Sequence, residues 1–390
     1  MPPGRAVYLK HAITTPIDPR VRDRIVACLE DDPRLAGSLL SDGRLAPRLL
    51  AEARERVALL AGGTAGEIVF TSGGAEASSL ALKGTALAPR PGRERRRLLV
   101  SATAPTPIRH PARSLARLGF AVEEIPVDRR GLLDLDALAD LLGDDVLIVS
   151  VEWVNAETGV VQPVAEIGET ARARGALFHV DASTAAAHFP VSAADLRADL
   201  MTFSAHRMYG PRGAGALLVR DGVRLAPLVE GGVEEGGRRG GAPSLALLAG
   251  FGEAAALAMI ERSGWIERSW SAGRAILEGL EEVPGVTVNG AGAPRVEALV
   301  NVSVPGAEGE SLLLDLARAG IAAASGSACY DEAGKPSHVL EAMGVAPRLA
   351  QGSVLFAAGR ETTLGDAEAV AIAFRAAVER LRRLSVSEVP

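Results

Sequence analysis

The fold is decided by the segment Phe203-Ser-Ala-His-Arg-Met-Tyr-Gly-Pro-Arg-Gly-Ala-Gly215, which lies between two short apolar runs, residues 200–203 and 214–220. Short, continuous apolar runs are typical of strands that are covered on both faces. Five further runs of this kind precede the segment: residues 67–70, 97–101, 121–125, 146–151 and 177–181. Helical patterns separate most of them, so the sequence predicts a mostly parallel, seven-stranded sheet between layers of helices.

The pattern of the chain changes after residue 230. A glycine-rich stretch, residues 230–241, leads into a long helical region over residues 244–282. Two strands and two helices follow: residues 298–304 and 353–358, and residues 310–319 and 366–384. We therefore predict a large α/β domain over residues 15–255 and a smaller α+β domain made of residues 1–14 and 256–390.

The composition argues against several classes of protein. The net charge of −6 over 390 residues gives no reason to expect a nucleic acid or an anionic membrane as partner. No apolar run is long enough for a membrane-spanning helix, and the start of the chain lacks the apolar core of a signal peptide. The two cysteines, Cys28 and Cys329, form no metal-binding or disulfide pattern. A cytoplasmic protein without a bound metal is the simplest expectation. Cys28 is expected on a helix over residues 19–30, with its side chain in the protein core.

Two more motifs follow predicted strands. Phe70-Thr-Ser-Gly-Gly-Ala-Glu76 is a glycine-rich turn between a strand and a helix, which can present backbone N–H groups to a phosphate. Phe178-His-Val-Asp181 ends a strand with a carboxylate that can pair with a protonated ring nitrogen. Taken alone, the first motif equally fits a tight turn and the second a helix cap.

Together these segments strongly resemble one family. The segment from Phe203 to Gly215, with Asp181 upstream and Trp153-Val-Asn-Ala-Glu-Thr-Gly159, resembles the class V aminotransferases, which are fold type I enzymes dependent on pyridoxal phosphate (PLP). Ser325-Gly-Ser-Ala-Cys329 and Lys335-Pro-Ser-His-Val-Leu-Glu-Ala-Met-Gly344 resemble the catalytic cysteine loop of the cysteine desulfurases. The resemblance extends from about Val7 to beyond Arg360 and implies the fold type I PLP-transferase architecture.

The resemblance also implies a chemistry and a set of site residues. In the family a lysine holds PLP as a Schiff base, an aspartate keeps the ring protonated, and a loop cysteine receives sulfur from free cysteine as a persulfide. Cys329 is then the candidate persulfide carrier, or alternatively an inherited relic. The cofactor-binding candidates are Gly74, Asn155, Asp181, Ser204 and His206, with Arg207 at the lysine position. Each of two candidates also has a purely structural interpretation. Asp181 fits an anion that is hydrogen-bonded to nearby backbone, and His206 fits a polar residue held in the turn.

The sequence departs from the family at this site. Arg207 cannot supply a neutral amine, because a guanidinium stays protonated and delocalised. By our alignment the family's ring-stacking histidine, phosphate-binding threonine, glutamine and carboxylate-binding arginine are replaced as well, by Pro105, Ala75, Thr184 and Leu355. A threonine that reaches the partner subunit's phosphate is replaced by Ala242. Only Lys10, Lys83 and Lys335 remain as lysines, and a Schiff base relocated to Lys10 or Lys335 is one alternative.

Three hypotheses about function follow. The first is a degenerate homologue, a pseudoenzyme that acts as a sulfur-relay, scaffold or regulatory protein. The second is an active cysteine desulfurase that uses PLP non-covalently or through another lysine. The third is an anion-binding protein in which Arg207 and Arg238 or Arg239 hold the anion. The resemblance implies a homodimer, or a heterodimer with an active paralogue, and a sulfur acceptor such as an iron–sulfur scaffold protein.

Overall fold

The computed structural model describes residues 6–30, 45–89, 95–325 and 336–386. Its largest sheet has seven strands in the order β2-β8-β7-β6-β5-β3-β4. They are β2 (Ile68–Thr71), β3 (Arg97–Ser101), β4 (Ala121–Ile125), β5 (Val146–Glu152), β6 (Leu177–Asp181), β7 (Leu200–Ser204) and β8 (Gly215–Val219). β8 runs antiparallel to its neighbours β2 and β7, and the other neighbouring pairs are parallel. The predicted mostly parallel, seven-stranded sheet is confirmed, and each strand lies within one residue of its predicted bounds.

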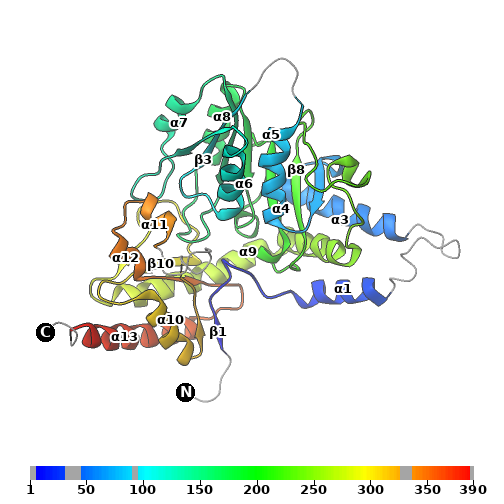
Figure 1. Cartoon of the computed structure of the whole chain (residues 1–390). Helices are drawn as coiled ribbons and strands as arrows, with labels where there is room; N and C mark the ends of the chain where they lie inside the picture. The colour runs from blue at the N-terminus through cyan, green and yellow to red at the C-terminus, as the bar shows by residue number, and fades with distance from the viewer. Residues whose placement is uncertain (1–5, 31–44, 90–94, 326–335, 387–390) are drawn as a thin grey trace.

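Two apolar layers cover this sheet. On one face, α4 (Gly74–Ser79), the π-helical turn Leu80–Gly84 and α6 (Thr106–Ala116) pack on side chains such as Val100 and Leu217. On the other face, α3 (Leu45–Ala61), α8 (Val164–Ala173) and α9 (Leu245–Glu281) pack on Val149, Phe178 and Phe203. Figure 1 shows the sheet between these helices, with α7 (Leu135–Leu141) at its upper edge. Burial on both faces explains why the strands are continuously apolar.

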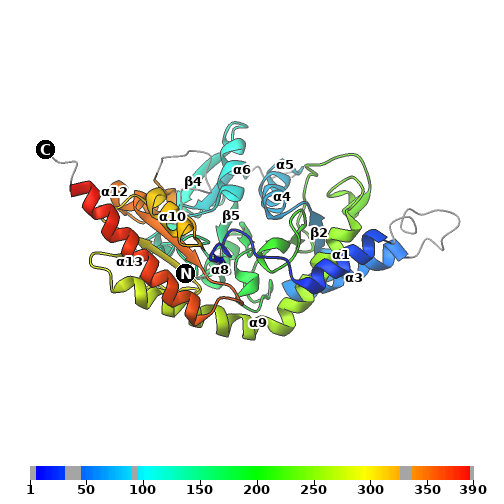
Figure 2. The ribbon, with the colours of Figure 1, turned by 90° about the horizontal axis from the view of Figure 1, so that it is seen from below.

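The C-terminal part forms a second, smaller layer. β10 (Leu299–Ser303) pairs antiparallel with β12 (Ser353–Ala357) and β9 (Thr287–Val288). The helices of the C-terminal part are α10 (Gly309–Arg318), α11 (His338–Ala342), α12 (Pro347–Gln351) and α13 (Leu364–Val386). Near the N-terminus, the chain forms α1 (Pro19–Glu30). α9 packs against α1, α3 and α13 and runs beneath both parts (Figure 2). Because α9 continues unbroken through residue 255, the domain boundaries stay a prediction.

The N-terminal segment joins the C-terminal part. β1 (Val7–Tyr8) pairs in parallel with β11 (Ile321–Ala322), and Lys10 bridges to Ala357. Cys28, predicted to lie in the core, is buried on α1. None of the helices in the described ranges is long and apolar enough to cross a membrane.

The strand ends place several polar residues at one edge of the large sheet. Glu152 and Asp181 are the last residues of β5 and β6, and they are direct partners in the register of this parallel pair. Ser204 ends the next strand, β7. Carboxyl ends of parallel strands meet at the same edge of a sheet, where open α/β folds bind their ligands.

Candidate functional site

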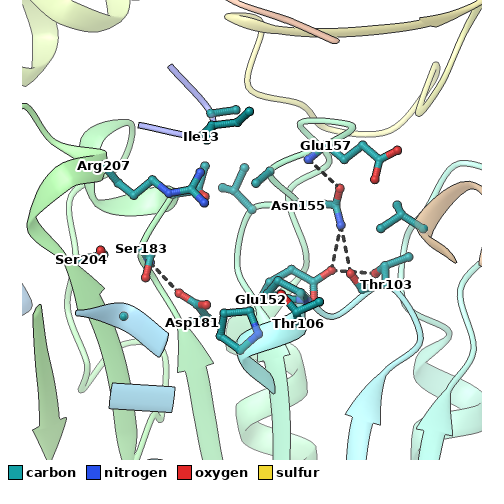
Figure 3. A pocket seen from close by; sticks show the side chains of 18 of the residues that line it. Ile13, Thr103, Thr106, Glu152, Asn155, Glu157, Asp181, Ser183, Ser204 and Arg207 are labelled. Atoms are coloured by element: carbon teal, nitrogen blue, oxygen red, sulfur yellow. Dashed lines mark hydrogen bonds between the residues drawn. The ribbon is translucent and has the colours of Figure 1, made fainter. Parts of the chain in front are cut away.

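A cavity of about 300 Å³ opens at this edge of the sheet (Figure 3). Its walls come from the strand ends, from Ala12 and Ile13 near the N-terminus, and from Val339 and Leu355 of the C-terminal part. Six of the predicted site residues line it: Gly74, Asn155, Asp181, Ser204, His206 and Arg207. The seventh, Cys329, lies outside the described residues. The sequence thus located the cavity, although the roles of these residues stay predictions.

The substituted positions surround the same cavity. Four of the five departures besides Arg207 line it: Ala75, Pro105, Thr184 and Leu355. The predicted departures from the family pattern therefore lie around one space. Arg238 and Arg239, suggested as anion-binding partners of Arg207, do not belong to its lining. Their guanidinium Nε atoms donate instead to the Glu235 carbonyl (3.0 Å) and to Glu76 (3.1 Å).

Asp181 lies at the floor of the cavity. Its Oδ1 accepts a hydrogen bond from the backbone N–H of Ser183 at 2.9 Å. Burial raises the pKa of Asp181, while the Ser183 hydrogen bond and the positive charge of Arg207 act in the opposite direction. Arg207 therefore supplies a countercharge for this carboxylate from within the chain.

Arg207 ends the short 3-10 turn Ala205–Arg207 that follows β7, and its side chain extends along the cavity wall (Figure 3). A covalently held PLP requires a lysine amine at this place. Among the described residues that line the cavity there is no lysine, and neither Lys10 nor Lys83 is part of the wall. The described residues of the wall therefore offer no amine for a Schiff base with PLP.

The wall near Arg207 carries further polar groups. Among the described residues, neither the buried Ser204 hydroxyl nor Nδ1 of His206 has a hydrogen-bond partner. Burial lowers the pKa of His206 to about 4, with smaller contributions from Arg207 and Arg212, so its ring is neutral at pH 7. A Cβ on Gly74 would come within 3.1 Å of the Ser183 Oγ and 3.2 Å of the Ser204 Cβ, so glycine keeps this corner open.

Asn155 uses its side chain to hold the loop after β5. Its Nδ2 donates to the Thr103 carbonyl and to Glu152 Oε1, both at 3.2 Å. Its Oδ1 accepts hydrogen bonds from the backbone N–H groups of Glu157 (3.1 Å) and Thr158 (3.0 Å). The amide thus organises the wall of the cavity.

Sequence reasoning missed two buried glutamates in this wall. Oε1 of Glu152 accepts a hydrogen bond from Thr103 Oγ1 at 2.7 Å, and Oε2 of Glu157 accepts one from Ser337 Oγ at 2.8 Å. Burial raises the pKa of both, that of Glu157 to about 7, and the neighbouring Asp181 adds to the effect on Glu152. The signal for Glu152 was its place directly after the apolar run 146–151, where a charged residue still belongs to the buried strand.

Comparisons with known proteins agree with this architecture. Residues 7–359 match the family model described as aminotransferase class-V. The chain is 35% identical over 382 residues to a cysteine desulfurase IscS of Dictyoglomus turgidum, spanning 98% of this chain and 96% of the relative. It is 37% identical over 381 residues to cysteine desulfurase IscS 1 of Archaeoglobus fulgidus, spanning 97% and 98%.

A solved structure shares the fold. The X-ray structure of a NifS-like protein from Rickettsia africae superposes with a TM-score of 0.85 at 27% identity, covering 96% of this chain and all (100%) of that one. The predicted fold type I PLP-transferase architecture is therefore confirmed. By sequence, over nearly its full length, and by fold, the chain belongs to the aminotransferase class-V family and, within it, to the cysteine desulfurases.

Proposed function

We propose that this protein is a cysteine desulfurase homologue that does not form the Schiff base of the conventional reaction and serves as a sulfur-relay, scaffold or regulatory protein. One observation carries the proposal: a guanidinium, that of Arg207, stands in the cavity where the reaction needs a neutral amine. The substitutions at Ala75, Pro105, Thr184 and Leu355 support it, because each removes a separate contribution to binding or turnover.

A second candidate is an active desulfurase. The names of the relatives from Dictyoglomus turgidum and Archaeoglobus fulgidus favour it, since both are called cysteine desulfurases. This function requires PLP held without a covalent bond or through another lysine, with Cys329 as the persulfide carrier. Iron–sulfur cluster assembly would then be its natural setting.

One experiment separates the two candidates. The purified full-length protein is mixed with PLP, its visible spectrum is recorded before and after L-cysteine, and sulfide release is assayed beside the Dictyoglomus turgidum relative. We expect the relative to release sulfide and this protein to release none, with no borohydride-stable PLP label on any lysine. Sulfide release that is lost in Cys329→Ala would instead establish the second candidate.

A sulfur-relay role assigns a definite step to Cys329. Its thiolate attacks the outer sulfur of a persulfide on an active desulfurase, the donor's sulfur–sulfur bond breaks, and the donor leaves as a thiolate. Incubation with a persulfide-loaded desulfurase is expected to add one sulfur atom to this chain by intact-protein mass spectrometry. The Cys28→Ala variant retains the gain and the Cys329→Ala variant loses it. If both variants gain sulfur equally, the relay role is wrong and the scaffold and regulatory roles remain.

The partners of the proposed function follow the family. We propose a homodimer, or a heterodimer with an active paralogue, in the cytoplasm, with a sulfur acceptor as a further partner. Light scattering of the protein alone and mixed with an active desulfurase distinguishes the two kinds of dimer. A mass of two chains in isolation supports the homodimer, and a mixed complex formed from a monomer supports the heterodimer.

A further inference from the structure

Several polar atoms in the cavity have no hydrogen-bond partner in the part of the chain that the structure describes. They include Oε2 of Glu152, Oε1 of Glu157 and Oγ of Ser204, on residues that are only 2%, 6% and 2% exposed. A buried polar atom without a partner costs about 1–3 kcal/mol, so a natural protein rarely keeps several in one place. Their shared cavity indicates a bound ligand that completes these hydrogen bonds.

Glu152 is the most informative of these groups. Thr103 Oγ1 and Asn155 Nδ2 both donate to its Oε1, which fixes the carboxyl group and leaves Oε2 for the cavity. Asp181 is its register partner on the neighbouring strand, so two carboxyl groups stand side by side at the floor (Figure 3). Two adjacent buried carboxyl groups disfavour an anion at this place and favour a cation.

The opposite wall of the cavity favours an anionic group. Arg207 extends from the turn after β7, and the Ser204 hydroxyl lies at the start of that turn. A guanidinium and a hydroxyl are donors suited to phosphate or carboxylate oxygens. The cavity therefore has an acidic floor and a wall that accepts an anionic group.

We propose that the cavity binds, without a covalent bond, a small molecule that carries both a protonated primary amine and an anionic group, with Glu152 Oε2 receiving the amine. The proposal rests on the proposed function, because it describes how the cavity is used once the Schiff base is lost. Glu152 is the residue that determines specificity. An ammonium donates to its Oε2 and brings a positive charge beside the two carboxyl groups, which favours their ionised forms, whereas a hydroxyl in the same place only donates.

Two classes of small molecule share this chemistry: amines that carry a phosphate and amines that carry a carboxylate. Matched pairs of probes distinguish them. Pyridoxamine 5′-phosphate and pyridoxine 5′-phosphate differ only by an amine in place of a hydroxyl. L-alanine and L-lactate differ in the same way and carry a carboxylate instead of a phosphate. Titration calorimetry on the full-length protein is expected to show at least about tenfold tighter binding of the amine member in one pair, as for a hydrogen bond between charged groups. The pair that shows the preference identifies the class.

Variants then test the role of Glu152. Glu152→Gln keeps an oxygen for Thr103 and Asn155 and places an amide N–H₂ group where Oε2 was, so the preference for the amine is expected to fall below about threefold. Glu278→Gln, on the exposed face of α9, is the matched control and keeps the preference. Equal binding within both pairs by the native protein, no binding of any probe, or a preference that survives Glu152→Gln would each overturn the proposal.

Failure of this inference and failure of the proposed function give different results. None of the four probes carries an aldehyde, so none reacts with a lysine. If the protein releases sulfide from cysteine and still prefers the amine probes through Glu152, the proposed function fails and the ligand inference stands. If it releases no sulfide and shows no preference, the reverse holds.

Discussion

At position 207 the cavity carries a guanidinium, whose chemistry differs from that of an amine. A lysine loses its proton in a buried site and becomes a nucleophile, but an arginine keeps its charge at every pH a protein survives. Here that charge also acts on Asp181, whose carboxylate would otherwise stand buried with only the Ser183 hydrogen bond. Arg207 thus favours the ionised form of Asp181 without a cofactor ring.

Restoring the amine tests this reading directly. Arg207→Lys in the presence of PLP is expected to gain a visible absorption band and a near-stoichiometric, borohydride-stable label at position 207, because the new side chain can lose its proton and react. The matched control is Arg212→Lys, an exposed arginine in the same segment, which is expected to stay unlabelled. An unlabelled Arg207→Lys protein that remains folded would show that the other substitutions, and not position 207, exclude the cofactor.

At the scale of the elements, His179 ties three strands and a helix together. His179 is the middle residue of β6. Its Nδ1 lies 2.7 Å from Ser150 Oγ on β5, and its Nε2 lies 2.9 Å from Thr202 Oγ1 on β7. Ser78 of α4 donates to the same Thr202 hydroxyl at 3.1 Å. This hydrogen-bonded chain explains how a fully buried histidine is tolerated in the middle of the sheet.

The chain of hydrogen bonds makes stability depend on pH. Burial lowers the pKa of His179 to about 3, while the unfolded histidine takes up a proton near its ordinary value of 6.5. The contribution of neutral His179 is therefore complete above pH 6.5 and is lost as the pH falls from there towards 3. In urea unfolding, His179→Gln is expected to cost about 2 kcal/mol at pH 7.5 and much less at pH 5. The exposed His110→Gln serves as control, and a penalty that is equal at both pH values would contradict the argument.

Glu157 has the opposite dependence. Burial raises its pKa to about 7 from the ordinary 4.5, so the folded protein keeps the proton that the unfolded chain releases. This destabilises the fold progressively between pH 4.5 and 7 and no further above. Glu157→Gln, which keeps an acceptor for Ser337, is expected to become more stable relative to the native chain by about 3 kcal/mol between pH 4.5 and 8, measured by urea unfolding. An equal difference at the two pH values would show that Glu157 titrates normally.

The sequence predicted the elements well where an apolar run was long enough to be recognised. The strands of the large sheet and helices such as α1 and α9 have strong periodic patterns, and these agree with the structure. The two-residue strands β1 and β11 were missed, because a pair of residues has no periodicity and only the distant partner makes it a strand. Glu152 was missed for a related reason: one carboxylate after an apolar run has no periodicity, and its partners Thr103 and Asn155 lie in neighbouring loops.

At the scale of the whole molecule, the cavity depends on how the two parts of the chain meet. The floor and the Arg207 wall come from the large sheet, and Val339 and Leu355 come from the C-terminal part. The motifs that the sequence revealed all lie in separate segments, and only the fold brings their ends together. For this reason the sequence located the cavity but not the charge distribution within it.

Arg360 is a central contact between the parts. Only 10% of its side chain is exposed, and its NH2 lies 2.7 Å from Asp18 Oδ2, close to the start of α1. The guanidinium also stacks over the ring of Tyr209, 4.0 Å from its centroid, and over Trp265 of α9. Its backbone N–H donates to the Tyr209 hydroxyl at 2.9 Å. Tyr209 is only two residues beyond Arg207, so this contact supports the wall of the cavity from behind.

Removing this contact is expected to affect both stability and the cavity. Arg360→Leu loses the charged pair and the stacking, but Asp18 keeps Arg20 at 2.8 Å, so the cost is about 2 kcal/mol and not that of an orphaned buried charge. Arg360→Lys keeps the charge but not the planar stacking. Its thermal midpoint is expected to lie between those of the native protein and Arg360→Leu. Because Tyr209 then loses its support, ligands that bind at Arg207 should bind more weakly to Arg360→Leu than to a variant of similar stability loss away from the cavity, such as Leu138→Ala in α7. If the two variants bind such ligands equally, Arg360 stabilises the joint between the parts without shaping the cavity.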